Sequence, residues 1–511
     1  MNLLKSIFSI GFITLFSKIL GFFRDVLIAQ MFGAQIYTDA FFLSFKIPNY
    51  LKKFFSEGIF FQAFLPILIG YKNNKKNNKF LKKFVSSVFC ATIIIVSLIS
   101  VVGIFFSKYI VLIIAPGFDI NTIKFSLTVH LLQIMFPYVL FSSLAIFISS
   151  ILHSYNYFLI PALSPVIFNI ILISCVYFVS SYFFIPIFSL AWGVILGSIF
   201  QFIYQIPFLK KINMLVIPKI NIFQIKLLKL IKILSPIVLG FFISQLSFLF
   251  NSFFSSYIAS GSISWIYYAN RIMEFPVGII GISLSTVLLP FLSKIFSLGN
   301  QKDYNNLLDW GLRLSIVLGI PCSIIIGIFS YPIIVSLFQY GYFNYFDSIM
   351  TSKALSAYSI GLMAFILIKI VSPAFYSRQN LKIPINSYII SIILTQCMNF
   401  LLVVKYRHVG LIFSSVIGSW IHFVILIYYL FKKKFFIPCN KWKKFFYRIL
   451  ISSISMIFFL ILFLKLINVW NEGSNIFRIT RLFIILFISI FIYTMTLFFL
   501  GYNIKYNKKL Y

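Results

Sequence analysis

Long apolar segments, separated by short polar breaks, follow one another along the whole 511-residue chain. A helix needs about 20 apolar residues to cross the hydrocarbon core of a bilayer, and segments of at least that length recur from end to end. The breaks leave no room for a separate soluble domain. The pattern predicts an all-α membrane protein with about fourteen transmembrane helices, at residues 5–31, 38–70, 84–114, 124–152, 161–181, 186–208, 226–257, 262–294, 310–337, 353–376, 384–404, 409–431, 445–467 and 478–500.

The composition excludes a soluble globular protein of this length, because 61% of the residues are hydrophobic and only 10% are charged. The formal net charge of +34 would suggest a nucleic-acid partner in a soluble protein. Here most of the basic residues lie in short loops between apolar segments, where they set the orientation in the membrane. No nucleic-acid partner is predicted.

Basic residues mark alternate loops. Counting sides from an N-terminus on the inside places the lysine-rich stretches on one face, at 71–83, 209–232, 431–448 and 505–511. The opposite face receives three loops without Lys or Arg, at 115–122, 340–348 and 468–475, and one basic exception at 405–410. The positive-inside rule therefore predicts a multi-pass protein with both termini in the cytoplasm.

An internal repeat divides the chain. The sequence LGFF at 20–23 recurs at 239–242, and a cation precedes a Leu-Pro pair by a similar distance in the following helix of each half: 20 residues from Lys46 to Pro66 and 19 from Arg271 to Pro290. Six helices per repeat is an even number, so both halves insert the same way up, related by a pseudo-two-fold axis along the membrane normal. The predicted organisation is an N-terminal six-helix lobe (1–208), a basic cytoplasmic linker (209–232), a C-terminal six-helix lobe (233–431) and a C-terminal helix pair with a tail (432–511).

Charged residues concentrate in the first, second and eighth predicted helices. A charge that faces lipid at the bilayer centre costs about 2.5–3.5 kcal/mol, so these groups are expected to line a cavity. Cations outnumber carboxylates there, and this surplus favours an anionic substrate such as a phosphate head group. The carboxylates are Asp25, Asp39, Glu57 and Glu274, and the cations are Lys18, Arg24, Lys46, Lys52, Lys53 and Arg271.

Structural roles remain open for several of these charges. Lys18 and Lys52 could extend along apolar surface toward water. Arg24 and Asp25 are neighbours that point about 100° apart on a helix, so each is expected to need another partner. Arg271 and Glu274 could pair with each other at i, i+3.

No pattern predicts catalysis. The chain has no GxSxG, P-loop or dinucleotide-binding motif, and its five cysteines and four histidines are scattered without metal-ligand spacing. Neither an enzyme nor a cofactor or metal site is predicted.

Several long motifs resemble the MurJ (MviN) family of lipid II flippases, within the multidrug/oligosaccharidyl-lipid/polysaccharide exporter superfamily. They are MNLLKS, SKILGFFRDVLIAQMFGA, TDAFFLSFKIPNYLKKFFSEGIFFQAFLPIL, SGSISWIYYANRIMEFPVGIIGISLSTVLLPFLSK and AFYSRQNLKIP. The resemblance implies an inner-membrane protein with two lobes around a cationic cavity. It also implies translocation of lipid II, the polyprenyl-pyrophosphate-linked peptidoglycan precursor, to the periplasmic leaflet, with the last two helices and the second lobe forming a groove for its tail.

Carried over residue by residue, the resemblance implies pyrophosphate contacts for Arg24, Arg271 and Lys46. The chain has Lys18 and Lys52 where relatives commonly carry Arg; these keep the charge and lose the bidentate fork. It also has Asn270 where relatives often carry Asp. The implied substrate-binding positions are Ser17, Lys18, Arg24, Asp25, Asp39, Lys46, Asn49, Lys52, Glu57, Ser264, Arg271 and Glu274.

Two other functions fit parts of the pattern. A flippase for another polyprenyl-linked oligosaccharide would use the same cavity, with different sugar contacts. A drug or cation antiporter is disfavoured, because the seventh predicted helix lacks a carboxylate and the charge surplus is positive. Cell-wall synthesis enzymes are conceivable partners beside lipid II and membrane lipids.

Overall fold

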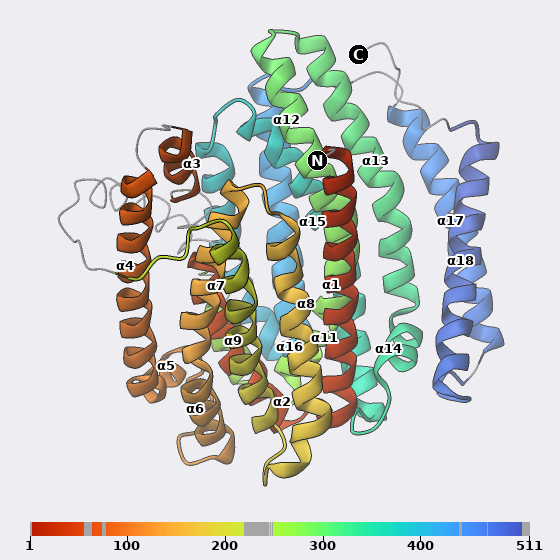
Figure 1. The fold of residues 1–511 in the computed structure, drawn as a ribbon. Helices are drawn as coiled ribbons and strands as arrows, with labels where there is room; N and C mark the ends of the chain where they lie inside the picture. The colour runs from red at the N-terminus through yellow and green to blue at the C-terminus, as the bar shows by residue number, and fades with distance from the viewer. Residues whose placement is uncertain are drawn as a thin grey trace. The chain divides into compact units, whose positions relative to one another are not determined.

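The computed structural model describes residues 3–55, 64–73, 78–218, 245, 247, 249–438, 442–467 and 469–502. These residues form helices and connecting turns, with no strand among them (Figure 1). Ten of the described helices are long and apolar enough to cross a membrane. The all-helical membrane architecture is thereby confirmed, and the count of fourteen spans stays a prediction. The chain divides into two compact units, Met1–Ser264 and Trp265–Tyr511, called here the first and the second unit.

In the first unit, α1 packs on α8, α2 on α6, and α9 on both α7 and α8. Of the predicted linker at 209–232, the residues after 218 lie outside the described residues, and 209–211 form the end of α9. Most of the seventh predicted helix also lies outside them, although 249–256 are helical. The elements are α1 (Leu3–Phe32), α2 (Ile36–Lys53), α3 (Leu65–Asn73), α4 (Asn78–Phe105), α5 (Ser107–Ile114), α6 (Ile123–Met135), α7 (Pro137–Ser154), α8 (Leu159–Ser174) with a π turn at Cys175–Val179, and α9 (Phe188–Lys211).

In the second unit, α15 packs between α13 and α16, and α17 and α18 lie side by side (Figure 1). Helix α11 begins at Ser262, in the last residues of the first unit. The elements are α11 (Ser262–Pro276) with a π segment at Val277–Ile282, α12 (Ser283–Ser297), α13 (Gln301–Ile328), α14 (Ser330–Phe338), α15 (Tyr345–Tyr376), α16 (Lys382–Lys432), α17 (Trp442–Leu466) and α18 (Asn475–Phe499).

The prediction of a six-residue basic loop at 405–410 is wrong, because most of these residues are helical. Helix α16 runs through it, and the only residue there with non-helical dihedral angles is Arg407, at φ 52° and ψ −129°. The two predicted helices therefore meet at a one-residue kink. Gly410 permits the close approach, because a Cβ on it would lie 2.2 Å from the carbonyl oxygen of Leu402.

The same turn recurs in both units. A residue with positive φ follows α7 at Asn156 (63°) and follows α15 at Gln379 (56°). In each case an Ile-Pro pair comes four residues later, ending at Pro161 and at Pro384. Each positive-φ amide donates to the carbonyl three residues earlier at 3.0 Å, which satisfies an otherwise unpaired group at the helix end. This recurrence supports the internal repeat.

A second recurrence lies in the preceding helices. The predicted span 84–114 breaks at Phe106 between α4 and α5, and the predicted span 310–337 breaks at Phe329 between α13 and α14. Both breaks fall at the Phe that directly precedes Ser, in Gly-Ile-Phe-Phe-Ser at 103–107 and in Gly-Ile-Phe-Ser at 327–330. The third helix of each predicted repeat is therefore interrupted at a similar sequence.

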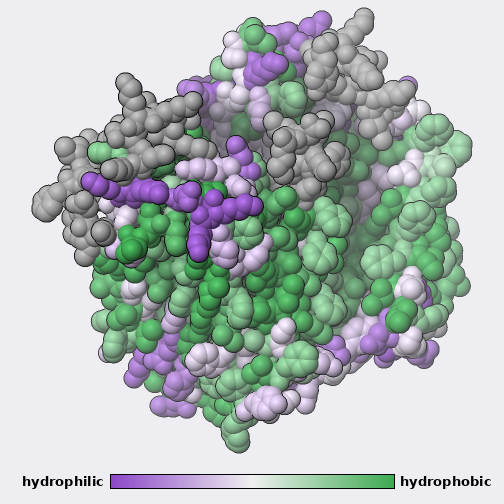
Figure 2. All heavy atoms as spheres, in the orientation of Figure 1, coloured by the Kyte–Doolittle hydropathy of each residue, from purple (hydrophilic) through white to green (hydrophobic). Residues whose placement is uncertain are grey.

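Large apolar side chains are exposed along the helices of both units. Phe12, Phe458 and Phe487 are each at least 70% exposed. In Figure 2 hydrophobic side chains cover the middle of the helices, and hydrophilic ones gather near their ends. Such a surface would aggregate in water and suits contact with lipid.

Candidate substrate-binding site

Arg24 is held from two helices of the first unit. Its Nε and Nη2 donate to Asp25 Oδ1 at 2.9 and 2.6 Å, and its Nη1 donates to Asn169 Oδ1 on α8 at 2.9 Å. Asn169 Nδ2 also donates to the carbonyl oxygen of Ser17 at 3.3 Å. One amide side chain thus joins two predicted site residues of α1.

The pairing of Arg24 with Asp25 corrects the expectation that these neighbours need separate partners. Their Cβ atoms do point about 100° apart. The arginine side chain is long enough to curve back along the helix surface, so its guanidinium reaches the Asp25 carboxylate, which is fully buried.

Asn49 and Lys52 of α2 meet at one aromatic side chain. Tyr138 Oη on α7 donates to Asn49 Oδ1 at 3.3 Å. The Nζ of Lys52 lies 5.3 Å from the Tyr138 ring centroid and 5.7 Å from that of Phe168. The Lys52 ammonium therefore rests against the negative faces of two rings, and its side chain is half-buried.

Asp39 is fully buried and accepts four hydrogen bonds. Its Oδ1 accepts from the amide and hydroxyl of Ser264 at 2.9 and 2.7 Å. Its Oδ2 accepts from the amide of Gly261 at 2.7 Å and from Lys124 Nζ at 2.9 Å. Two predicted site residues, Asp39 and Ser264, are thus in direct contact, and Lys124 joins them although the sequence analysis did not select it.

The remaining positions of the first unit are dispersed. Lys18 is exposed on α1, and Lys46 is half-buried on α2, two turns after Asp39. Glu57 lies outside the described residues.

In the second unit, Arg271 and Glu274 of α11 form the pair that their i, i+3 spacing allowed. Arg271 Nη1 donates to Glu274 Oε2 at 3.4 Å, a long contact, and the Glu274 side chain is 55% exposed. Asn270 Nδ2 donates to Glu274 Oε1 at 2.9 Å. An aspartate at 270 could not make this donation, so the asparagine gives Glu274 a neutral donor.

A further polar cluster follows Ser264. Trp265 Nε1 donates to Asp347 Oδ1 at 2.9 Å, and the His408 ring centroid lies 5.1 Å from that of Trp265. Asp347 also caps the start of α15 through a reciprocal pair of bonds with Asn344. Nothing in the sequence pattern pointed to this cluster, because its members come from three separate helices.

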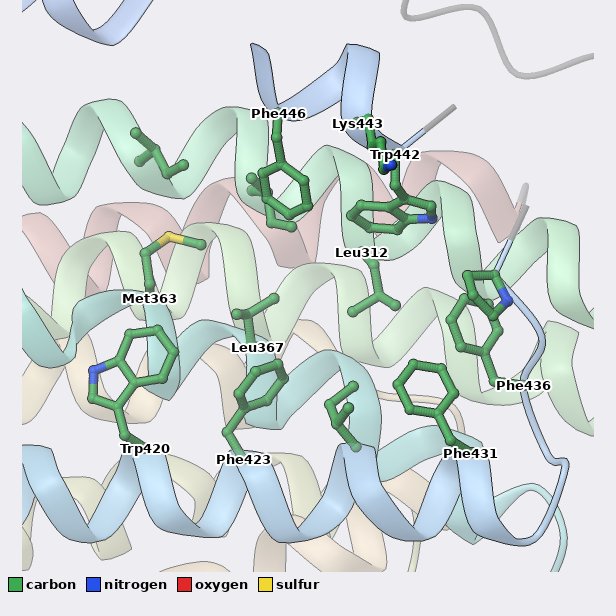
Figure 3. Close-up of a pocket in the computed structure, with 14 residues that line it drawn as sticks. Leu312, Met363, Leu367, Trp420, Phe423, Phe431, Phe436, Trp442, Lys443 and Phe446 are labelled. Atoms are coloured by element: carbon green, nitrogen blue, oxygen red, sulfur yellow. The ribbon is translucent and has the colours of Figure 1, made fainter. Parts of the chain in front are cut away.

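An apolar cavity of about 850 Å³ lies inside the second unit. Figure 3 shows aromatic side chains of α16 facing α13, α15 and α17 across it. Trp442, at one end, is fixed by donation from its Nε1 to Asp309 Oδ1 at 2.8 Å. Lys443 is the one charged residue among the fourteen that line it, which are Leu312, Ile316, Ile320, Met363, Leu367, Trp420, Phe423, Ile427, Phe431, Phe436, Pro438, Trp442, Lys443 and Phe446.

The helices, their lipid-facing surface and their buried charge clusters define a multi-pass α-helical membrane protein of the transporter kind. A family model described as "Lipid II flippase MurJ" matches residues 28–499. The chain belongs to the MurJ family of lipid II flippases.

Relatives and solved structures agree with this assignment. The chain is 48% identical to a "Probable lipid II flippase MurJ" of Buchnera aphidicola subsp. Schizaphis graminum, over 100% of this chain and 99% of that one. It is 37% identical to the "Lipid II flippase MurJ" of Burkholderia cenocepacia, over 87% of each. A solved lipid II flippase MurJ in an inward closed conformation is similar at a TM-score of 0.79 and 29% identity, covering 95% of this chain and 97% of that one. An inward-facing multidrug resistance MATE family transporter shares the fold alone, at a TM-score of 0.67 and 12% identity over 82% and 94% of the two chains.

Proposed function

We propose that this protein is a lipid II flippase of the bacterial inner membrane. It moves the undecaprenyl-pyrophosphate-linked peptidoglycan precursor from the cytoplasmic to the periplasmic leaflet by alternating access, with both termini in the cytoplasm. The observation that carries the proposal is the match to the MurJ family along the whole chain. The surplus of cations in the charged helices supports an anionic head group.

We assign the pyrophosphate to Arg24, Arg271 and Lys46. Arg24 is presented by Asp25 and Asn169, whose bonds fix the plane of its guanidinium. A phosphate oxygen that approaches Arg24 replaces the Asp25 carboxylate as the acceptor of its hydrogen bonds. Until then the carboxylate occupies that acceptor position and orients the arginine. Arg271 makes a long contact of 3.4 Å with the exposed Glu274 carboxylate, and a doubly charged pyrophosphate competes with that carboxylate for the guanidinium.

The apolar cavity of the second unit suits the polyprenyl tail. A hydrocarbon chain gains about 0.8 kcal/mol for each buried methylene relative to water. In a membrane, moving a methylene from lipid into the cavity gains less free energy than moving it from water. The shape of the cavity, more than its apolar character, therefore selects the tail and directs its path. Its aromatic lining and its volume of about 850 Å³ support this assignment.

The decisive experiment replaces the flippase of a bacterium with this chain and measures lipid II on the outer leaflet. We expect normal exposure of lipid II and continued growth, without enzymatic change to the substrate. Exposure that stays at the depleted level would overturn the proposal. If another polyprenyl-linked glycan were flipped instead, its exposure would rise while lipid II stayed inside; accumulation of cationic drugs on depletion would favour an antiporter.

A further inference from the structure

Lys124 occupies a position that is unfavourable for a cation. It lies in the first turn of α6, where the helix dipole presents positive charge. It also follows directly on the loop 115–122, which carries no other basic residue. A lysine in such a place needs a compensating partner, and the Asp39 carboxylate at 2.9 Å supplies one.

The Lys124 ammonium is fixed on two sides. Beside the Asp39 contact, its Nζ lies 4.5 Å from the ring centroid of Phe118, a buried side chain in the preceding loop. Helix α6 packs along α2, which carries Asp39. The ammonium and the carboxylate therefore belong to one packed pair of helices.

The other three bonds of Asp39 go to a single turn of the chain. The amide of Gly261 and the amide and hydroxyl of Ser264 donate them, where α11 begins. Gly261 has a φ of 94°, a conformation that glycine adopts without strain, and this directs its N–H to the carboxylate. If the turn moves, Asp39 loses three of its four donors and keeps only Lys124.

We propose that Lys124 is the positioning residue for Asp39. Its ammonium holds the carboxylate aimed at Gly261 and Ser264, and it remains as the partner of Asp39 whenever the turn departs. The bonds between Asp39 and the turn at 261–264 can then break and reform as a latch during transport. This inference rests on the proposed flippase function, because it gives the latch a role in the transport cycle.

Hydrogen exchange on the purified full-length protein tests the latch directly. In Lys124→Met, we expect the amides of Gly261 and Ser264 to exchange about tenfold faster, since removing one partner of a buried ion pair destabilises the other strongly. Exchange around the capped start of α15 should not change. Lys124→Arg should keep the slow exchange, and Lys108→Met, at an exposed lysine in the first turn of α5, is the matched control. Unchanged exchange in Lys124→Met would overturn the inference.

A double substitution separates positioning from general stability. If Lys124 acts only through the Asp39 charge, Lys124→Met combined with Asp39→Asn should flip lipid II as well as Asp39→Asn alone. Losses that multiply would show that Lys124 acts elsewhere. If Lys124→Met fails to accumulate in the membrane, the double variant should restore accumulation, and its failure to do so would also overturn the inference.

Should the unchanged chain not flip lipid II, the proposed function fails while the exchange result still decides the role of Lys124.

Discussion

At the scale of single residues, the two arginines assigned to the substrate differ in how firmly the protein holds them. Arg24 is bound at all three guanidinium nitrogens by Asp25 and Asn169, and its side chain is 12% exposed. The Arg271 side chain is 27% exposed, and its ion pair with Glu274 spans 3.4 Å. Arg24 is therefore preorganised by its neighbours, and Arg271 is the more accessible of the two to a ligand.

Replacing either arginine by alanine should abolish flipping without preventing membrane insertion. Each change removes several charge-assisted bonds worth about 1.5–3 kcal/mol apiece. Every lost bond lowers the rate about tenfold to a hundredfold, and together these losses leave no measurable flipping. The measurement is growth and outer-leaflet lipid II in a strain that depends on the variant. Lys465→Ala, at an exposed lysine near the end of α17, should behave as the unchanged chain. Normal growth of Arg24→Ala or Arg271→Ala at ordinary expression would refute the pyrophosphate assignment.

The sequence could indicate that charges in membrane helices need partners, because an isolated buried charge is too costly. It could not identify those partners. Asn169 and Tyr138 lie on helices more than 80 residues away from Arg24 and Asn49, and their importance arises only from packing. Lys124 did leave a signal, since it is a cation beside a loop otherwise free of Lys and Arg.

At the scale of helices, apolar length located the spans well but not their interruptions. The predicted spans 84–114, 124–152 and 310–337 coincide with helices that break at Phe106, Phe136 and Phe329. Hydropathy does not detect such breaks, because a phenylalanine contributes the same apolar surface whether or not its backbone continues the helix. The break at Phe136 has a local cause in Pro137, which lacks the N–H that would continue the ladder.

The kink in α16 predicts a stabilising substitution. Arg407 adopts φ 52° and ψ −129°, a region that costs a non-glycine residue about 1–3 kcal/mol. Arg407→Gly should relieve roughly 1 kcal/mol of this strain and raise the midpoint of thermal unfolding in detergent. The arginine is exposed, so few contacts are lost. Arg407→Ala removes the same side chain without relieving the strain; an equal rise in both variants would contradict the explanation.

The cavity beside α17 predicts a dependence on tail length. Met363→Trp extends a larger side chain into it and should displace about two methylenes of a polyprenyl tail into lipid. Because lipid replaces water as the alternative, the cost stays below about 1.6 kcal/mol, and flipping of the full-length substrate should fall by up to about tenfold. A substrate analogue with a short prenyl chain should be flipped at an unchanged rate. Phe487→Trp on the exposed face of α18 is the control. An equal loss for both chain lengths would place the tail elsewhere.

At the scale of the whole molecule, the internal repeat and the charges of the loops are two separate features of the sequence that bear on its orientation in the membrane. The recurring turns at Asn156 and Gln379 support the predicted internal repeat. The sequence predicts six spans between these turns, and an even number predicts both turns on the same side of the membrane, which the positive-inside rule assigns to the cytoplasm. Both positive-φ turns should therefore lie inside the cell.

That orientation can be tested with single cysteines in a variant whose five native cysteines are replaced. In spheroplasts, a thiol reagent that does not cross membranes should label Asn121→Cys and Asn471→Cys, which are exposed and lie in loops predicted to face outward. It should label Lys433→Cys, in the exposed basic segment after α16, only once the membrane is permeabilised. The reason is that lysine clusters near helix ends resist translocation, whereas loops without Lys or Arg cross readily. Labelling of Lys433→Cys from outside, together with protection of the other two, would show that the protein has the opposite orientation in the membrane. Protection of Asn471→Cys alone would show that the last two predicted helices do not both cross the membrane.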